Sequence, residues 1–154
     1  MAWITPKTDW KAKYNELGDY IGDYFNVSDY NRIINNLYML NDLYLQYNKP
    51  QVAFETFDTI AVNDLAYAET FNKIERNMEA LIKGYGGLNA LIGQMKIYLN
   101  NGKTIDYDEL NRIESLSLEI YELLPIEYKA QRQLEFSLGL NNIGEFSTLA
   151  GEVA

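Results

Sequence analysis

Three copies of a short pattern constrain the fold of this chain more than any other feature. The pattern is an aromatic residue or Leu, then Asn, then a basic residue, then Ile. It occupies residues 30–33, 71–74 and 110–113. A period of about 40 residues is typical of a duplicated helical unit. The chain is therefore expected to contain three related helices.

Apolar residues extend each copy of the pattern at alternating steps of three and four positions, the spacing of a buried stripe on an α-helix. The stripes span residues 30–44, 71–85 and 110–124. Ser117 is their one polar position. Because three such stripes can bury one another, we predict an all-α fold, a helical bundle built on three related helix units.

Capping residues, prolines and glycines divide the bundle into about four to five predicted helices. We expect a short helix from Asp9 to Gly22, the first repeat helix from Ser28 to Tyr47, the second from Asn63 to Gly84, a shorter helix from Leu88 to Leu99, and the third repeat helix from the capping pair Asp106 and Glu109 to Pro125. Residues 49–62 are rich in β-branched and aromatic side chains and are predicted to be an extended connector on the bundle.

Both ends of the chain are predicted to be extended arms. Pro6 disfavours helix in the residue before it, so residues 1–8 are expected to form an N-terminal arm. Residues 126–154 lose the apolar period and are expected to form an extended or partly mobile C-terminal tail. The helical bundle domain is thus predicted to span residues 9–125.

The composition argues against catalysis. The chain of 154 residues has no Cys and no His, the commonest soft metal ligand and the commonest general base. It also has no phosphate-binding P-loop and no GxGxxG motif. We therefore expect no enzymatic activity, no metal site and no cofactor.

The charge argues against two classes of partner. Acidic residues outnumber basic ones by 22 to 13, giving a net charge of −9, whereas binding to phosphate backbones or anionic membranes needs excess Lys and Arg. No apolar run is long enough to span a bilayer, and the N-terminus lacks the layout of a signal peptide. We expect synthesis in a cytoplasm, with neither nucleic acid nor membrane as partner.

Asn31, Asn72 and Asn111 lie at the same place in each repeat. Asn is a poor residue for a helix interior because its amide competes for backbone hydrogen bonds. We interpret the three side chains as structural clamps, each bonding the backbone of a neighbouring extended segment. The alternative is a ligand site made of three amides.

Tyrosine is unusually frequent, with 13 copies. Tyr and Trp combine a large contact area with a polar tip and are enriched at interfaces. We therefore consider Trp3, Ile4, Trp10, Tyr24 and Tyr38 as interface candidates, and a homo-oligomer as one outcome. The alternative is that these aromatic residues line the edge of the protein's own core.

Two segments resemble a known family. Residues 3–10, WITPKTDW, and residues 24–36, YFNVSDYNRIINN, resemble the N-terminal segment of structural tail and baseplate proteins of phages and prophages of Gram-positive bacteria. Residues 105–114 resemble the same module, and an insert at about residues 11–23 departs from it. The resemblance implies a structural part of a virion tail whose partners are other virion or tail proteins.

The sequence thus predicts a structural subunit of a phage or prophage tail or baseplate, located in the virion and acting through protein–protein contacts. Two other functions remain open. One is a small acidic phage regulator that binds and blocks a host protein, which clustering of acidic residues on one face would favour. The other is a carbohydrate-binding adhesin, which an aromatic cleft would favour. Apolar patches at opposite ends of the molecule would favour the assembly role.

Overall fold

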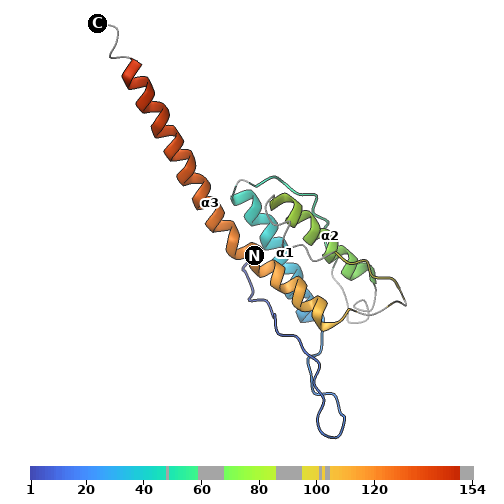
Figure 1. The fold of residues 1–154 in the computed structure, drawn as a ribbon. Coiled ribbons are helices and arrows are strands. Elements are labelled where there is room, and N and C mark those ends of the chain that lie inside the picture. The colour runs from blue at the N-terminus through green and yellow to red at the C-terminus, as the bar shows by residue number, and fades with distance from the viewer. Residues whose placement is uncertain (48, 59–67, 86–94, 101, 103–104, 150–154) are drawn as a thin grey trace.

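The structure is a computed structural model that describes the chain except for residues 48, 59–67, 86–94, 101, 103–104 and 150–154, with residues 139–149 described by their backbone alone. Its described part contains three α-helices: α1 (Val27–Gln46), α2 (Ala68–Tyr85) and α3 (Tyr107–Leu149) (Figure 1). The all-α prediction is confirmed, with three helices in this part instead of the four to five expected.

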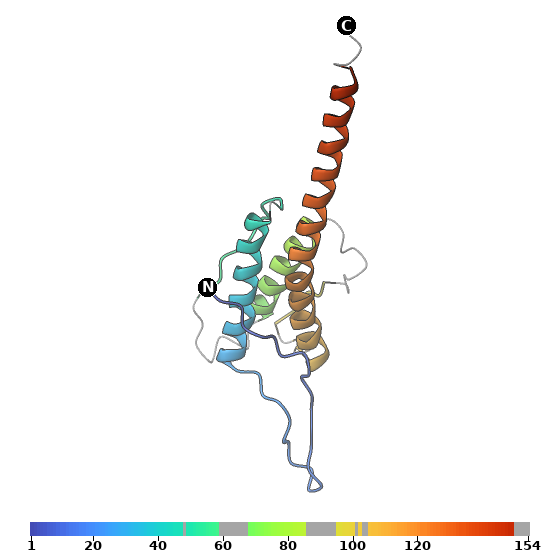
Figure 2. The same cartoon turned by 90° about the vertical axis from the view of Figure 1, so that its left-hand side faces the viewer.

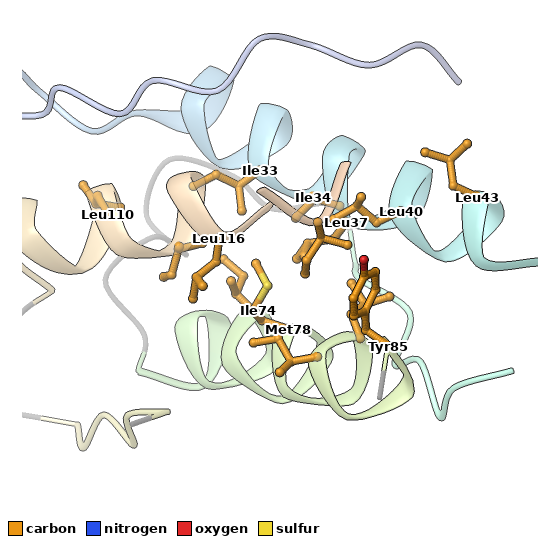
Figure 3. Packing of buried hydrophobic residues seen from close by; sticks show 14 of the residues in the cluster. Ile33, Ile34, Leu37, Leu40, Leu43, Ile74, Met78, Tyr85, Leu110 and Leu116 are labelled. Atoms are coloured by element: carbon orange, nitrogen blue, oxygen red, sulfur yellow. The ribbon is translucent and has the colours of Figure 1, made fainter. Parts of the chain in front are cut away.

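The three predicted stripes form one shared core. Every stripe position in α1, α2 and the first half of α3 is buried, and side chains from the three helices meet in the middle of the bundle (Figure 3). Ser117 is also buried, and its hydroxyl donates to the main-chain oxygen of Glu114 at 2.8 Å. The one polar stripe position is therefore satisfied by its own helix.

The helix starts follow the repeat as well. α1 begins after Asn26, whose side chain accepts from the main-chain N–H groups of Ser28 and Asp29, while the Asp29 carboxylate accepts from the N–H of Asn26. This is a capping box, so the cap lies two residues before the predicted Ser28. At the start of α3, the N–H of Glu109 donates to the side chain of Asp106 at 3.1 Å, as the predicted pair requires.

Residues 11–23 form a hairpin instead of the predicted helix over 9–22. Its two sides are joined by a bridge between Tyr14 and Tyr20, and Gly18 turns the chain with φ of 85°. The Asn15 side chain accepts from the N–H groups of Leu17 and Asp19 at 3.0 and 2.8 Å. Such local side-chain bonds compete with helix, which explains the wrong prediction. We call residues 11–23 the hairpin.

α3 does not stop at Pro125 but continues to Leu149, so the prediction of an extended tail is wrong for residues 126–149. Figure 1 shows this part, which we call the stem, leaving the bundle as a single helix. The apolar period is lost here because the stem packs on no other described element beyond its first turn. Residues 126–138 are nonetheless rich in Glu, Lys, Gln, Arg and Leu, which favour helix.

The remaining described segments are extended. Residues 1–10, which we call the arm, run along α1 and α3, and the hairpin projects from the end of the bundle opposite the stem (Figure 2). Residues 49–58 cross the bundle without helix, as predicted, and 95–99 are extended where a helix was expected. The rest of that predicted helix, 88–94, the end of the connector, 59–62, and the predicted cap Asn63 lie outside the described residues.

Candidate functional site

Four asparagine side chains each hold one extended residue by both its N–H and its C=O. Asn111 of α3 binds Trp10 at 2.7 and 3.0 Å, and Asn72 of α2 binds Tyr98 at 2.7 and 2.9 Å. The other two pairs are Asn36 with Ile4, and Asn77 with Glu55. A primary amide presents a donor and an acceptor side by side, which matches one residue of extended backbone.

The clamp expected at Asn31 is not found, and this prediction needs correction. Asn31 is exposed, and its side chain has no hydrogen bond among the described residues. In α1 the clamp is Asn36, five positions further along and almost fully buried. Asn77 is the equivalent position in the second repeat. The recurrence of an Asn at this position in both repeats is the sequence signal that could have identified Asn36 and Asn77 as clamps.

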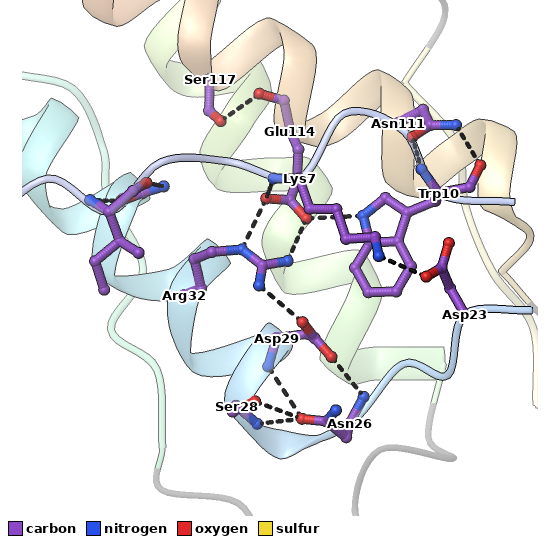
Figure 4. A network of polar contacts seen from close by, with 12 residues as sticks. Lys7, Trp10, Asp23, Asn26, Ser28, Asp29, Arg32, Asn111, Glu114 and Ser117 are labelled. Atoms are coloured by element: carbon purple, nitrogen blue, oxygen red, sulfur yellow. Dashed lines mark hydrogen bonds and ion pairs between the residues drawn. The ribbon is translucent and has the colours of Figure 1, made fainter.

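A buried ion-pair network lies beneath the arm (Figure 4). The Glu114 carboxylate accepts from Arg32 Nη2 at 2.7 Å and Arg32 Nε at 3.0 Å, and from the indole N–H of Trp10 at 2.9 Å. It also accepts from the main-chain N–H of Lys7 at 2.8 Å. Hydrogen bonding to Glu114 raises the pKa of Arg32. Glu114 therefore joins α1, α3 and the arm.

Several of the interface candidates pack against other parts of the same chain. The Trp3 ring stacks on Tyr121 of α3 at a centroid distance of 4.0 Å, and Trp10 is buried in the core. Ile4 is clamped by its backbone, and its side chain is 46% exposed. Tyr38 packs on Phe54 and Phe57. Trp3, Trp10 and Tyr38 thus pack within the protein's own fold, in line with the alternative of an aromatic core edge, and an interface role for them stays a prediction.

The hairpin carries a group of exposed apolar side chains. Leu17 at its tip is 87% exposed, and Tyr24, which follows its base and packs on Tyr20, is 69% exposed. The pairing of Tyr14 with Tyr20 places these two rings on one face of the hairpin and the exposed Ile21 on the other. Of the five interface candidates, Tyr24 is thus the most exposed, and it lies next to the hairpin.

The hairpin is held firmly despite its exposure. The Asp23 carboxylate accepts from the main-chain N–H of Lys11 at 2.9 Å and pairs with Lys7 Nζ at 2.5 Å. Tyr20 and Tyr107 both donate to the main-chain oxygen of Asp23, joining the hairpin base to α3. The Lys7 ammonium lowers the pKa of Asp23, chiefly through their hydrogen bond. A fixed hairpin presents its tip with little loss of freedom on binding.

The stem carries a second group of exposed apolar side chains. Its first turn is tied to the bundle by Lys49–Glu127 at 2.9 Å and by Tyr47 against Tyr128. Beyond this turn, the side chains described are exposed. The large apolar ones on the stem are Ile126, Leu134, Phe136 and Leu138, between 56% and 68% exposed.

No group of acidic, His or Cys side chains suited to a metal ion occurs in the described residues. Among those residues, too, no helix combines the length and hydropathy that crossing a membrane requires. Comparisons with protein-family models, curated proteins and solved structures found no match.

Proposed function

We propose that this protein is a structural subunit of a phage or prophage tail or baseplate, which joins neighbouring proteins through the hairpin and the stem. The observation that carries the proposal is the position of its exposed apolar side chains. One group lies on the hairpin and the adjoining Tyr24, and another lies on the stem, although some exposed apolar side chains, such as Ile97 and Leu99, lie on neither. Figure 1 shows that the hairpin and the stem leave the bundle at opposite ends. Exposed apolar patches of this kind mark contact surfaces.

The two ends differ in what they offer a neighbour. The hairpin presents Leu17 on a compact turn, which suits insertion into a hollow on a partner. The stem presents apolar residues along a helix that leaves the bundle, and helices in proteins gain most of their stability from packing against other elements. Packing against other helices would stabilise it. A subunit with one contact at each end can link two neighbours, as an assembly part must.

The resemblance of residues 3–10 and 24–36 to tail and baseplate proteins supports the same proposal. In the structure these two segments contact each other, since the indole of Trp10 lies against Phe25 and near the guanidinium of Arg32. The two stretches of that pattern therefore pack on each other, and we infer that they help to hold the arm on the bundle.

The proposal is tested by asking whether the chain is part of a particle. Particles released after prophage induction of the strain that encodes the chain are purified on a density gradient and analysed by quantitative mass spectrometry. We expect the chain at a fixed ratio to the other tail proteins through successive gradient fractions. Its presence in the lysate but absence from purified particles would contradict the proposal.

A further inference from the structure

α3 passes from the bundle into the stem at a proline. Leu124 is fully buried in the shared core, and Pro125, directly after it, is exposed. No described residue beyond Leu124 belongs to the core cluster. Pro125 lies inside α3 and has no N–H for the carbonyl four residues before it, that of Tyr121, which its ring also crowds. The helix therefore loses a backbone hydrogen bond where its packing ends, and sharp helix bends occur mostly at such prolines.

Beyond this proline, two contacts hold the first turn of the stem. Lys49 Nζ pairs with the Glu127 carboxylate at 2.9 Å, and the ring of Tyr47 packs on that of Tyr128 with centroids 5.2 Å apart. We call these two contacts the latch. Tyr47 and Lys49 both lie just after the last residue of α1. The latch thus joins the stem to one short segment of the bundle.

The bundle side of the latch is held in place. The main-chain N–H of Lys49 donates to the main-chain oxygen of Tyr44, a core residue, at 2.8 Å. The Lys49 ammonium lies over the ring of Tyr85, 4.5 Å from its centroid. Burial acts to raise the pKa of Glu127, but Lys49 and Tyr85 together outweigh this and lower it. The Glu127 carboxylate is therefore charged at neutral pH and attracted to a cation that the bundle positions.

Beyond Tyr128, the described stem makes no contact with the bundle. Every side chain from Lys129 to Leu138 is exposed. An ion pair in this part, Arg132 with Glu135 at 3.8 Å, lies within the stem itself. The direction of the stem therefore depends on the backbone at Pro125 and on the latch.

We propose that α3 has a hinge at Pro125 and that the latch selects the direction in which the stem leaves the bundle. With the latch closed, the stem has the direction seen in Figure 2. With Lys49 and Glu127 apart, the stem swings about Pro125 and remains helical. A partner that binds the stem in another direction must open the latch, so the latch biases which partners fit. This inference goes beyond the proposed function, because it concerns the isolated chain and can hold or fail whether or not the stem contacts a neighbour.

The direction of the stem can be measured by double electron–electron resonance between two nitroxide labels. The chain has no Cys, so Asp42→Cys on α1 and Ser137→Cys on the stem define both label positions, and both residues are exposed. Residue 137 lies about 18 Å along the helix from Pro125, so a swing of about 20° moves it by about 6 Å. Dilution with unlabelled chain keeps the measured distances within one molecule.

We expect a narrow distance distribution for the doubly labelled parent chain. Glu127→Gln removes the charge that Lys49 pairs with, and should make the distribution at least about twice as wide. Glu135→Gln is the matched control, because it makes the same substitution at an exposed stem residue outside the latch, and it should leave the distribution unchanged. Equal distributions for the parent chain and Glu127→Gln would overturn the proposal, because the latch would then not set the direction of the stem.

Pro125→Ala tests the position of the hinge. Alanine supplies the missing N–H, so adding Pro125→Ala to Glu127→Gln should return the distribution to the width of the parent chain. A distribution that stays wide would overturn the hinge at Pro125. Circular dichroism of each variant completes the test. A loss of helix signal with Glu127→Gln would mean that the stem unfolds instead of swinging, which would also overturn the proposal.

Discussion

At the residue scale, the arm is attached by side-chain amides and by one carboxylate, not by a β-sheet. Asn36 and Asn111 fix its backbone at Ile4 and Trp10, and Glu114 accepts from it in between. These bonds recognise extended backbone and depend little on which side chain the bound residue carries. The position of the arm along the bundle is therefore set by its two Trp rings, because Trp3 stacks on Tyr121 and Trp10 is buried.

Replacing a clamp should destabilise the fold, whereas replacing Asn31 should not. Asn111→Ala leaves the N–H and C=O of Trp10 without their partner, which we expect to lower the free energy of unfolding by about 1–3 kcal/mol. Asn31→Ala is the matched control and should stay within about 0.5 kcal/mol of the wild type. Urea unfolding followed by circular dichroism measures both. Equal losses for the two variants would contradict the clamp assignment.

Glu75 should give part of the stability a dependence on pH. Burial raises the pKa of Glu75 above its ordinary value of 4.5, despite Arg112 beside it. The folded state then holds a proton that the unfolded state releases, so this contribution is present at acid pH and is lost as the pH rises through the folded-state pKa. The difference in unfolding free energy between wild type and Glu75→Gln should therefore fall as the pH rises from about 4.5. A difference that is flat or rises over this range would refute the buried, partly desolvated carboxylate.

At the scale of the elements, the sequence predicts the helices that pack in the core, but it does not predict the elements that lie outside the core. The stripes of α1, α2 and the first half of α3 could be predicted because burial imposes a helical period on apolar residues. The stem could not be predicted, because a helix that packs on nothing needs no apolar stripe. In addition, Pro125 indicates a helix end in the sequence, although it lies inside α3. The hairpin was missed because Trp10, Tyr14, Leu17 and Ile21 are spaced as in a helix by coincidence.

The candidate site was predictable to a similar degree. The period located Asn72 and Asn111, and nothing local in the sequence shows that Asn31 lacks a segment to hold. The pairing of Arg32 with Glu114 joins residues far apart in the chain, so it depends on how the helices are arranged. Such pairs become visible only when α1 and α3 are placed side by side.

Two truncations should separate the stem from the arm. Removing residues 129–154 should reduce the far-ultraviolet helix signal but change the unfolding free energy of the bundle by less than about 0.5 kcal/mol, because the stem side chains described there are exposed. Removing residues 1–10 should cost at least about 2 kcal/mol, because Trp10 and several buried hydrogen bonds are lost.

A loss of this size would favour a core role for Trp3 and Trp10 over the interface role that the sequence analysis considers for them. Urea unfolding of both truncated proteins as dilute samples makes the comparison. If the protein without its arm unfolds at the same urea concentration as the full chain, the arm contacts contribute nothing to stability and the structural role assigned to Trp3 and Trp10 is wrong.

At the scale of the whole molecule, a three-helix bundle separates the hairpin from the stem, and both carry exposed apolar side chains. The bundle holds the hairpin through Asp23 and Tyr107 and holds the first turn of the stem through Lys49 and Tyr47. Each end is thus fixed to the same core. The acidic net charge of −9 keeps such a molecule from associating without specific contacts. We therefore propose that assembly depends on the two ends and stability on the middle of the molecule.

The most direct test of this account is the copy number of variant chains in purified particles. In a strain lacking the wild-type chain, a hairpin variant (Leu17→Asp) and a stem variant (Leu134→Asp with Leu138→Asp) are expressed, with Asn31→Ala as the control. Mass spectrometry should find both end variants reduced about tenfold or more in particles, although they fold with wild-type circular dichroism, and the control unchanged. Incorporation of both end variants at the wild-type copy number would contradict the claim that the protein assembles through its hairpin and stem.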